Sequence, residues 1–245
     1  NSYFIGIDLM NKYVLLWLEA PLQSWGFESK FGRRETLDFP TKSGVLGLIL
    51  SAMGRSGEQR ELLASFASLD FQVGIYPSKV KTPKLEDFHM VGSGYNANDP
   101  FETLMQAKTF KGTQPTNYSG ILTYRYYLQD MAFAVACQVP EQYESEIVSS
   151  LQSPTWSPYL GKKCCVPTEI IFQGLYETDE QAFNRAGEIS KLKDRSMVQR
   201  VYQGEFPNKG ESLLLNDVPT QFGTKKLYTS RYVTIVSQAY EETIS

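Results

Sequence analysis

One helix start constrains the fold of this chain more than any other feature of its sequence. From position 45 to position 53, apolar side chains recur at intervals of three and four residues, which is the spacing of one helix face. Pro40 cannot continue a helix backwards, and the hydroxyl of Thr41 or Ser43 can cap the free N–H groups of a first turn. The sequence therefore predicts a helix that begins near residues 41–43.

The same helix start has the composition of an anion site. Lys42 supplies a cation, Ser43 supplies a hydroxyl, and Gly44 leaves the backbone open. A phosphate could therefore approach the amides at the positive end of the helix dipole. An ordinary capped core helix explains the same residues and is the commoner case. A nucleotide-binding P-loop is excluded, because Thr36 and Thr41 stand where that motif requires glycine.

Apolar and alternating segments elsewhere in the chain indicate strands. Residues 13–20 form a short apolar run and residues 69–76 alternate, so both are predicted strands, with a helical segment at 59–68 between them. Residues 124–128 and 131–139 indicate two further strands, followed by a helix that Pro140 opens. More strands are predicted at 170–176 and 227–236. This order favours an α+β fold, a ferredoxin-like or RRM-like layer, although the aromatic RNP1 signature is absent from the sequence.

Residues 77–123 interrupt this order with a segment that has no sustained hydrophobic period. A loop of this length inside a compact domain is usually functional or disordered. Its lysines are interleaved with Phe and Tyr, a mixture in which cations can meet phosphates and rings can stack on bases. A flexible insertion whose rings pack onto the body is the alternative. We expect an N-terminal extension at 1–12, a body at 13–152 that includes this insertion, and a smaller β-rich C-terminal region at 153–245.

The charge of the chain restricts any nucleic-acid site to part of the surface. A net charge of −3 and a pI near 5.4 argue against binding over the whole molecule. Residues 185–209 carry six Lys and Arg against three Asp and Glu, which favours a solvated face over a binding site. No apolar run approaches the ~20 residues of a membrane helix, and the N-terminus lacks the pattern of a signal peptide. We therefore expect a cytoplasmic protein with no membrane partner.

The catalytic potential of the chain is limited by its single histidine. With only His89, no histidine pair, zinc triad or Ser-His-Asp set can form. Glu86 and Asp87 lie beside it in the sequence, but a solvated turn is a better explanation for these carboxylates than a metal site. A metal-independent ribonuclease that uses tyrosine, lysine and one histidine stays open as an alternative.

Several ordered segments resemble one known family. They are Pro21-Leu22-Gln23-Ser24-Trp25-Gly26, the run from Phe39 to Leu48, the run from Tyr124 to Phe133, and Ser157-Pro158-Tyr159-Leu160-Gly161-Lys162-Lys163-Cys164. These segments are similar to signatures of the CasD family, the subunits of type I-E CRISPR Cascade complexes that hold the 5′ handle of the crRNA. The resemblance extends from about residue 13 to residue 238.

The resemblance implies a non-catalytic scaffold rather than an enzyme. It implies a ferredoxin-like body with a long thumb-like β-hairpin at 77–123, which binds the crRNA 5′ handle and caps one end of a filament of CasC-type backbone subunits. A CasA-type large subunit would lie beside it, and target DNA would be reached only through the complex. Relatives that process crRNA are expected to carry a lysine directly before the histidine, whereas Phe88 precedes His89 here. The competing classes are the metal-independent endoribonuclease that processes CRISPR repeat RNA and a protein-only adaptor.

The resemblance also gives a set of candidate RNA-binding residues. No catalytic residue, metal ligand or cofactor is expected. The resemblance gives Lys30, Arg33, Arg34, Lys42, Ser43 and Gly44 in the first loop and helix start, and Lys162 and Lys163 in the Tyr-Leu-Gly segment. The composition of the insertion adds His89, Lys108 and Lys111.

Overall fold

The apolar run near the N-terminus forms an inner strand of the sheet. The structure is a computed structural model that describes residues 11–26, 32–80, 82–91 and 121–237. Strand β1 spans Tyr13–Gln23, and its side chains alternate between two hydrophobic cores on the two faces of the sheet. Val14 and Leu16 face one core, and Leu15 and Trp17 face the other. Burial on both faces explains why the strand is a continuous apolar run.

Four strands and the helices between them form a βαββαβ unit. Helices α1 (Lys42–Ala52) and α2 (Arg60–Phe66) connect β1 to β5 (Phe71–Tyr76). Strand β7 (Ile121–Gln138) is followed by a short 3-10 helix, η1 (Glu141–Tyr143), by α4 (Glu144–Gln152) and by β8 (Phe172–Tyr176). The four strands lie in the order β5-β7-β1-β8, and all neighbours are antiparallel. The predicted helices and the strands at 13–20, 69–76 and 170–176 are therefore confirmed within a few residues.

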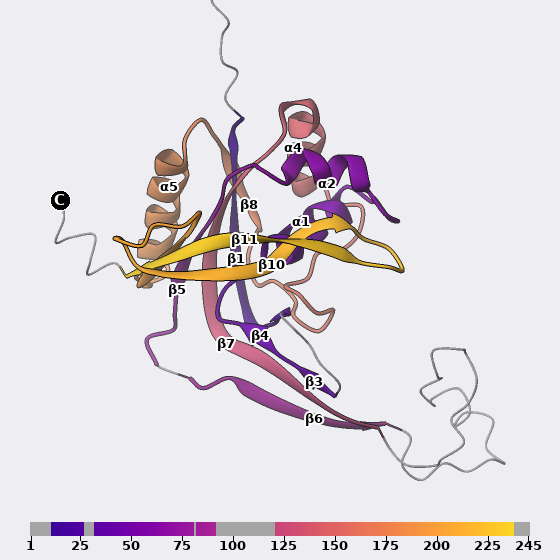
Figure 1. The fold of residues 1–245 in the computed structure, drawn as a ribbon. Helices are drawn as coiled ribbons and strands as arrows, with labels where there is room; N and C mark the ends of the chain where they lie inside the picture. Colours follow the sequence, from indigo (N-terminus) through magenta and orange to yellow (C-terminus); the bar gives the residue numbers. More distant parts are fainter. Residues whose placement is uncertain (1–10, 27–31, 81, 92–120, 238–245) are drawn as a thin grey trace, which may run out of the picture.

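The C-terminal part of the chain extends the same sheet. Helix α5 (Asp179–Leu192) leads to β9 (Gln199–Gln203), β10 (Glu211–Gln221) and β11 (Leu227–Ser237). Strand β9 pairs with β5, so the full path is β10-β11-β9-β5-β7-β1-β8. Figure 1 shows α5 on one side of β1 and β7, with α1, α2 and α4 on the other. The strand at 227–236 is confirmed, whereas α5, β9 and β10 were not predicted from the sequence.

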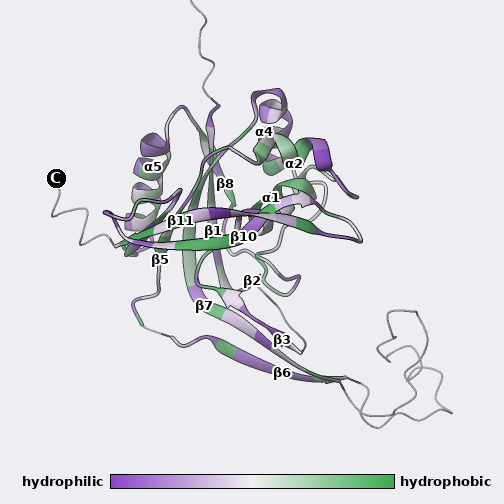
Figure 2. Ribbon diagram, in the orientation of Figure 1, coloured by the Kyte–Doolittle hydropathy of each residue, from purple (hydrophilic) through white to green (hydrophobic). Residues whose placement is uncertain are grey.

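A three-stranded ribbon projects from the body at the N-terminal end of β7. Strand β6 (Leu85–Val91) pairs antiparallel with β7, and β3 (Arg33–Arg34) pairs parallel with β7 on its other edge. Figure 1 shows this ribbon leading away from the helices, and Figure 2 shows hydrophilic stretches along β3 and β6. A separate two-stranded sheet joins β2 (Trp25–Gly26) to β4 (Thr36–Leu37). The rest of the predicted insertion, residues 92–120, lies outside the described residues.

The two strands predicted at 124–128 and 131–139 are one strand, so that prediction was wrong. The polar pair Gln129 and Asp130 looks like a turn, but the backbone passes through it with Asp130 at φ 48° and continues to pair with β1. Aspartate tolerates this left-handed conformation better than most residues. Arg195 holds the bend by donating to the Asp130 carbonyl at 3.1 Å and to its carboxylate at 2.7 Å.

The basic segment 185–209 is largely neutralised by acidic side chains of the fold. Lys193 and Arg195 both contact Glu19 of β1, at 3.2 and 3.1 Å, and Arg200 contacts Asp179 at 2.9 Å. These ion pairs join the end of α5 and the residues after it to β1, and they join β9 to the start of α5. Among the described residues, no helix combines the length and apolarity needed to cross a bilayer.

Candidate nucleic-acid interface

The predicted helix start is confirmed, together with its hydroxyl cap. Thr41 has extended backbone angles, φ −77° and ψ 150°, and directly precedes α1. Its side-chain oxygen accepts a hydrogen bond from the Gly44 amide at 3.1 Å, and its carbonyl accepts one from the Val45 amide at 3.1 Å. Two of the N–H groups at the start of α1 are therefore satisfied inside the chain.

An internal carboxylate lies at the positive end of this helix. The Lys42 amide donates to Asp217 of β10 at 2.7 Å. Asp217 also pairs with Arg231 of β11, whose Nε and Nη2 lie 2.8 and 2.9 Å from the two carboxylate oxygens. Negative charge is favoured at a helix N-terminus, so Asp217 already provides the anion that the sequence led us to expect from a phosphate.

The side chain of Lys42 points into the core, away from the surface where the predicted phosphate would approach. Lys42 has no exposed surface, and its ammonium donates to the Leu69 carbonyl at 2.7 Å, the Ala67 carbonyl at 3.2 Å and Gln203 Oε1 at 3.1 Å. Burial lowers the pKa of this ammonium to about 8, with nearby Arg231 adding a smaller shift in the same direction. A phosphate could reach this charge only after these contacts break.

The ribbon has two faces of different chemistry, which its register defines. Residues that pair across neighbouring strands point to the same side of a sheet. Arg33 pairs with Tyr124, which pairs with Phe88, and these three share one face. Arg34 pairs with Arg125, and Arg125 pairs with Asp87. These three residues therefore share the other face of the ribbon. We call the first the aromatic face and the second the basic face.

The basic face gathers cations that form no ion pair with the described residues. Arg34 and Arg125 lie directly opposite each other in register, and among the described residues neither forms an ion pair. Like charges in this arrangement repel each other unless an anion lies between them. Lys162 lies against the same face, with its ammonium 4.2 Å from the centre of the Tyr127 ring. Desolvation, and to a lesser degree Arg125, lower the pKa of Lys162, while Asp87 opposes this shift.

The Lys162 ammonium is itself an unsatisfied donor. Its nitrogen is buried, and within the described part of the chain it has no hydrogen-bond acceptor. The Thr123 hydroxyl, paired in register with His89 on the same face, is the other buried side-chain polar atom in this state. Buried polar groups are nearly always hydrogen-bonded in proteins, so these two donors are exceptions, and an external acceptor would reach them only after their side chains turn outward.

The loop that carries Lys162 is held by close contact between its backbone and the backbone of Ser24. The Ser24 amide donates to the Leu160 carbonyl at 3.2 Å, and the Leu160 amide donates to the Cys165 carbonyl at 2.8 Å. Gly161 has φ +89°, and a Cβ at this position would lie 1.7 Å from the Ser24 carbonyl oxygen. Only glycine fits here. Lys163 is exposed beside it.

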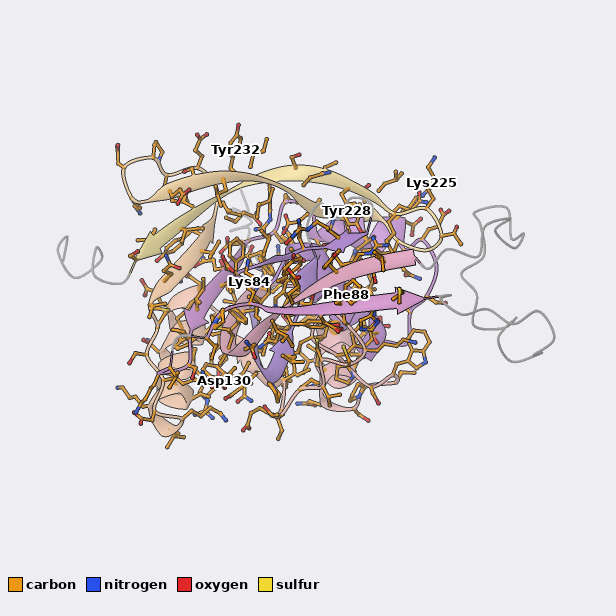
Figure 3. All side chains as sticks on the ribbon, turned by 90° about the horizontal axis from the view of Figure 1, so that it is seen from below. Lys84, Phe88, Asp130, Lys225, Tyr228 and Tyr232 are labelled. Atoms are coloured by element: carbon orange, nitrogen blue, oxygen red, sulfur yellow. The ribbon has the colours of Figure 1, made fainter. Side chains whose placement is uncertain are left out.

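The aromatic face is close to neutral because its charges are paired. Arg33 donates to the Tyr126 hydroxyl, which in turn bonds to Glu86, and Arg33 also pairs with Glu35 at 3.4 Å. Its guanidinium lies 5.9 Å from the centre of the Tyr124 ring. The predicted cation at Arg33 is thus paired within the chain, whereas Arg34 forms no ion pair with the residues that the structure describes. Figure 3 looks onto the ribbon, where Phe88 lies along β6.

The single histidine lies on the basic face and is bonded to a carboxylate. His89 Nε2 is 2.6 Å from Asp87 Oδ2. Among the described residues, no group of three or more His, Cys, Asp or Glu is placed to hold a metal ion. This pair can orient the imidazole toward a ligand on the basic face.

The structure brings some of the predicted residues together and separates others. Arg34, His89 and Lys162 converge on the basic face, whereas Ser43 and Gly44 are half-buried on the outer side of α1. Lys30, Lys108 and Lys111 lie outside the described residues. Sequence reasoning missed Arg125, although it lies in the Tyr-rich run at 124–133. The register with Arg34, which the sequence does not reveal, is what places it in the site.

The architecture and this site can be compared with known proteins. The family model described as CRISPR-associated protein (Cas_Cas5) matches residues 13–234. This chain belongs to the CRISPR-associated Cas5 family. The Cas5 chain is 29% identical over 180 residues to "CRISPR system Cascade subunit CasD" of Escherichia coli (strain K12), covering 70% of this chain and 74% of that protein.

Two solved structures share the fold of this Cas5 chain. A chain of a "CRISPR RNA-guided surveillance complex" matches with a TM-score of 0.66 and 27% identity, covering 92% of this chain and 89% of that one. A "Crystal structure of Cas protein" matches with a TM-score of 0.57 and 24% identity, covering 92% and 94%. The family model, which matches residues 13–234, covers β9 and β10 and reaches into β11. The C-terminal strands therefore belong to the region that this chain shares with the family.

Proposed function

We propose that this Cas5 protein is a non-catalytic RNA-binding scaffold of a type I-E Cascade surveillance complex, where it holds the 5′ handle of the crRNA. Its βαββαβ unit would be a ferredoxin-like body, and the ribbon of β3, β6 and β7 would be the base of a thumb-like hairpin. It would cap one end of a CasC-type backbone beside a CasA-type subunit, in the cytoplasm, and meet target DNA only through the complex. Support comes from the relative named as a Cascade subunit and from the surveillance-complex chain with the same fold.

The basic face of the ribbon is the observation that carries RNA binding. Three cations, Arg34, Arg125 and Lys162, face one carboxylate there, Asp87, which is bonded to His89. The chain as a whole carries a net charge of −3, so this excess is local. An RNA backbone would separate the two facing guanidinium groups, and it would supply an acceptor to the Lys162 ammonium once that buried side chain turns outward.

The test is the salt dependence of handle-RNA binding by variants of the two arginines that face each other across β3 and β7, Arg34 and Arg125. Removing a phosphate contact to single-stranded RNA should reduce the slope of log affinity against log salt by about 0.7. We expect this loss for Arg34→Ala and for Arg125→Ala. Arg33→Ala is the matched control, because Arg33 lies on the aromatic face and is already paired with Glu35. Equal slopes in all three variants and the wild type would remove the basic face from the RNA site.

One observation favours the alternative, a metal-independent endoribonuclease. The His89–Asp87 pair lies on the same face as Lys162, so an acid–base group and a cation would both be near a bound phosphate. Labelled repeat RNA incubated with the purified chain separates the two functions. A scaffold leaves the RNA intact with wild type and His89→Ala alike, whereas specific cleavage that His89→Ala abolishes would establish the nuclease.

A further inference from the structure

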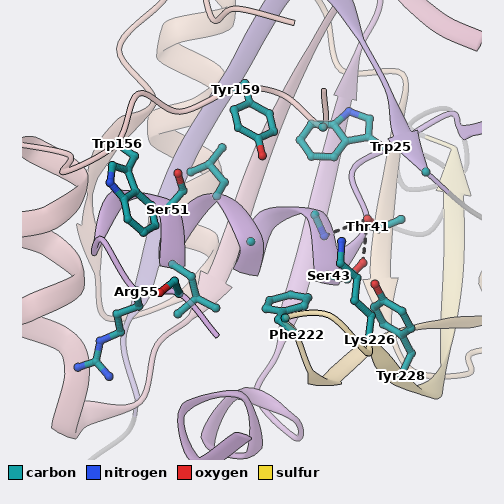
Figure 4. A pocket seen from close by; sticks show the side chains of 18 of the residues that line it. Trp25, Thr41, Ser43, Ser51, Arg55, Trp156, Tyr159, Phe222, Lys226 and Tyr228 are labelled. Atoms are coloured by element: carbon teal, nitrogen blue, oxygen red, sulfur yellow. Dashed lines mark hydrogen bonds between the residues drawn. The ribbon is translucent and has the colours of Figure 1, made fainter. Parts of the chain in front are cut away.

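Two neighbouring cysteines lie in the loop between α4 and β8. Figure 4 shows Tyr159, in the first part of this loop, lying beside α1. The chain then forms a tight turn over residues 162–165, in which the Cys165 amide donates to the Lys162 carbonyl at 2.8 Å. Cys164 occupies the third position of this turn and is exposed, whereas Cys165 is buried. The pair thus combines one thiol that solvent reaches with one that it does not.

The two thiols lie close to each other, to Lys162 and to Tyr127 of β7. The pKa of Cys165 is raised to about 12, by burial first and then by the charge of Cys164 and a hydrogen bond with it, while Lys162 opposes this shift. The Cys164 thiol also donates to the Tyr127 hydroxyl at 3.7 Å, and the Lys162 ammonium lies 4.2 Å from the centre of that ring. Four side chains that can carry a proton therefore meet where the turn packs against β7.

Lys162 is held in this cluster without a hydrogen bond. Its ammonium is buried and has no acceptor within the part of the chain that the structure describes. Desolvation lowers the pKa of Lys162, and the two thiols oppose this shift because negative charge on either sulfur would attract the ammonium. A neighbouring cation in turn favours the thiolate form of a cysteine, which is the form that reacts with oxidants. The Tyr127 ring, the turn and the two sulfur atoms are therefore what keep Lys162 inside.

A disulfide between the two adjacent cysteines cannot form without changing this turn. The peptide that joins them is trans, so their Cα atoms are about 3.8 Å apart. Ordinary disulfides join Cα atoms about 4.4–6.8 Å apart, so closing this one twists the peptide between the two residues. The Cys165 amide belongs to that peptide and makes the turn hydrogen bond to Lys162. Oxidation therefore loosens the turn, and the strain makes the new bond easy to reduce again.

We propose that Cys164 and Cys165 are a reversible oxidation site for peroxides, and that closing their disulfide releases Lys162 from Tyr127. The Cys164 thiolate attacks one oxygen of hydrogen peroxide, which forms a sulfenic acid and expels hydroxide. The Cys165 sulfur then attacks the sulfenic sulfur, so that the S–S bond forms as the S–O bond breaks. The pair loses two electrons, both thiol protons end in water, and hydrogen peroxide is reduced to two molecules of water.

The released lysine would join the cations that face RNA, a consequence that rests on the proposed function. A disulfide does not ionise, so oxidation removes the attraction of the sulfur atoms for Lys162 together with the turn hydrogen bond. An ammonium that turns outward can then reach a phosphate on the basic face. One added contact to single-stranded RNA should steepen the slope of log affinity against log salt by about 0.7.

The oxidation is tested on the whole chain without RNA. Wild type and Cys164→Ser are treated with a slight excess of hydrogen peroxide, unfolded and alkylated, and the modified cysteines are identified by mass spectrometry. The chain has three cysteines, and we expect the oxidised wild type to keep one free thiol, that of the fully buried Cys137. Dithiothreitol should restore all three. Cys164→Ser changes an exposed residue and should keep both of its thiols.

Limited trypsin digestion of the native protein measures the release of Lys162. Trypsin takes the lysine side chain into a pocket of its own, which the buried Lys162 ammonium cannot enter. Lys163 is exposed and serves as the internal reference. We expect cleavage after Lys162, relative to cleavage after Lys163, to rise severalfold on oxidation of the wild type, to fall again with dithiothreitol, and to stay constant in Cys164→Ser.

Three results would overturn the proposal. They are cysteines that all stay free, a Cys164 that ends as a sulfinic acid or bridges two chains, and a closed disulfide that leaves the trypsin cleavage ratio unchanged. None of them depends on RNA. A released Lys162 with an unchanged salt slope would instead remove this lysine from the proposed RNA site, and the oxidation site would stand.

Discussion

Replacing Lys42 with methionine should change the pH dependence of stability rather than RNA binding. The substitution keeps most of the side-chain volume and removes a buried ammonium whose pKa is lowered from 10.5 to about 8. The unfolded chain binds this proton more tightly than the folded chain, so stability rises with pH from about 8 to 10.5. Because the pKa of Lys42 is lowered by about 2.5, the free energy of unfolding should rise by roughly 3 kcal/mol between pH 8 and pH 10.5.

The same substitution removes the Lys42 donor from the Ala67 carbonyl, and it leaves the Leu69 carbonyl and Gln203 Oε1 with one remaining donor each, Gln203 Nε2 and Arg231. Each unsatisfied buried acceptor costs about 1–3 kcal/mol, which the relief of a buried charge partly offsets at neutral pH. Above pH 10.5 that relief disappears, because the wild-type lysine is then neutral in both states. Lys42→Met should therefore be mildly destabilised at pH 7, and by about 3 kcal/mol more at pH 10.5.

Urea unfolding at pH values from 7 to 10.5, followed by tryptophan fluorescence, measures this difference. Cys137 acts in the opposite direction, because burial raises its pKa to about 12 and stability is lost above pH 9. Because Lys42 and Cys137 each shift the pKa of the other, both proteins should carry Cys137→Ala, and the difference between them then isolates Lys42. A difference that stays flat across the range would refute the buried ammonium, and a reduced RNA salt slope for Lys42→Met would restore it to the phosphate site.

Three other substitutions test how the site is supported, each by urea unfolding. Thr41→Ala removes the cap of α1 and should cost about 0.5–2 kcal/mol. Asp217→Ala leaves Arg231 buried without its partner and should cost about 3–5 kcal/mol, whereas a cost below 1 kcal/mol would show that the pair is solvated. Gly161→Ala should destabilise the loop through the clash with the Ser24 carbonyl and weaken handle-RNA binding; unchanged binding would mean that the loop does not position a cation.

The local parts of the fold could be predicted from the sequence because their causes are local. The start of α1 follows from Pro40 and the Thr41 hydroxyl, and β1 follows from a run that is apolar on both faces. Strand β7 was divided wrongly because a residue that favours turns, Asp130, is held inside a strand by Arg195 from far along the chain. Propensity does not include such a tertiary contact.

The site was harder to predict because the orientation of each side chain and the register of the strands decide which residues belong to it. Lys42 has the composition of a phosphate ligand, but Asp217 lies at its amide and carbonyls of the α2–β5 connection surround its ammonium. Arg33 and Arg34 are equivalent in the sequence, and the alternation of a strand sends them to opposite faces. Arg125 joins the site only through its pairing with Arg34.

The central claim is that the basic face of the ribbon holds the crRNA, and crosslinking within the assembled complex tests it most directly. The complex would be purified with its RNA, irradiated, and digested, and the RNA-linked peptides of this chain would be identified by mass spectrometry. The account predicts one discrete RNA whose 5′ handle is crosslinked to peptides that contain Arg34, Arg125 or Lys162. An assembled complex in which this chain yields no RNA-linked peptide, or only peptides from α5, would contradict it and favour a protein-only adaptor.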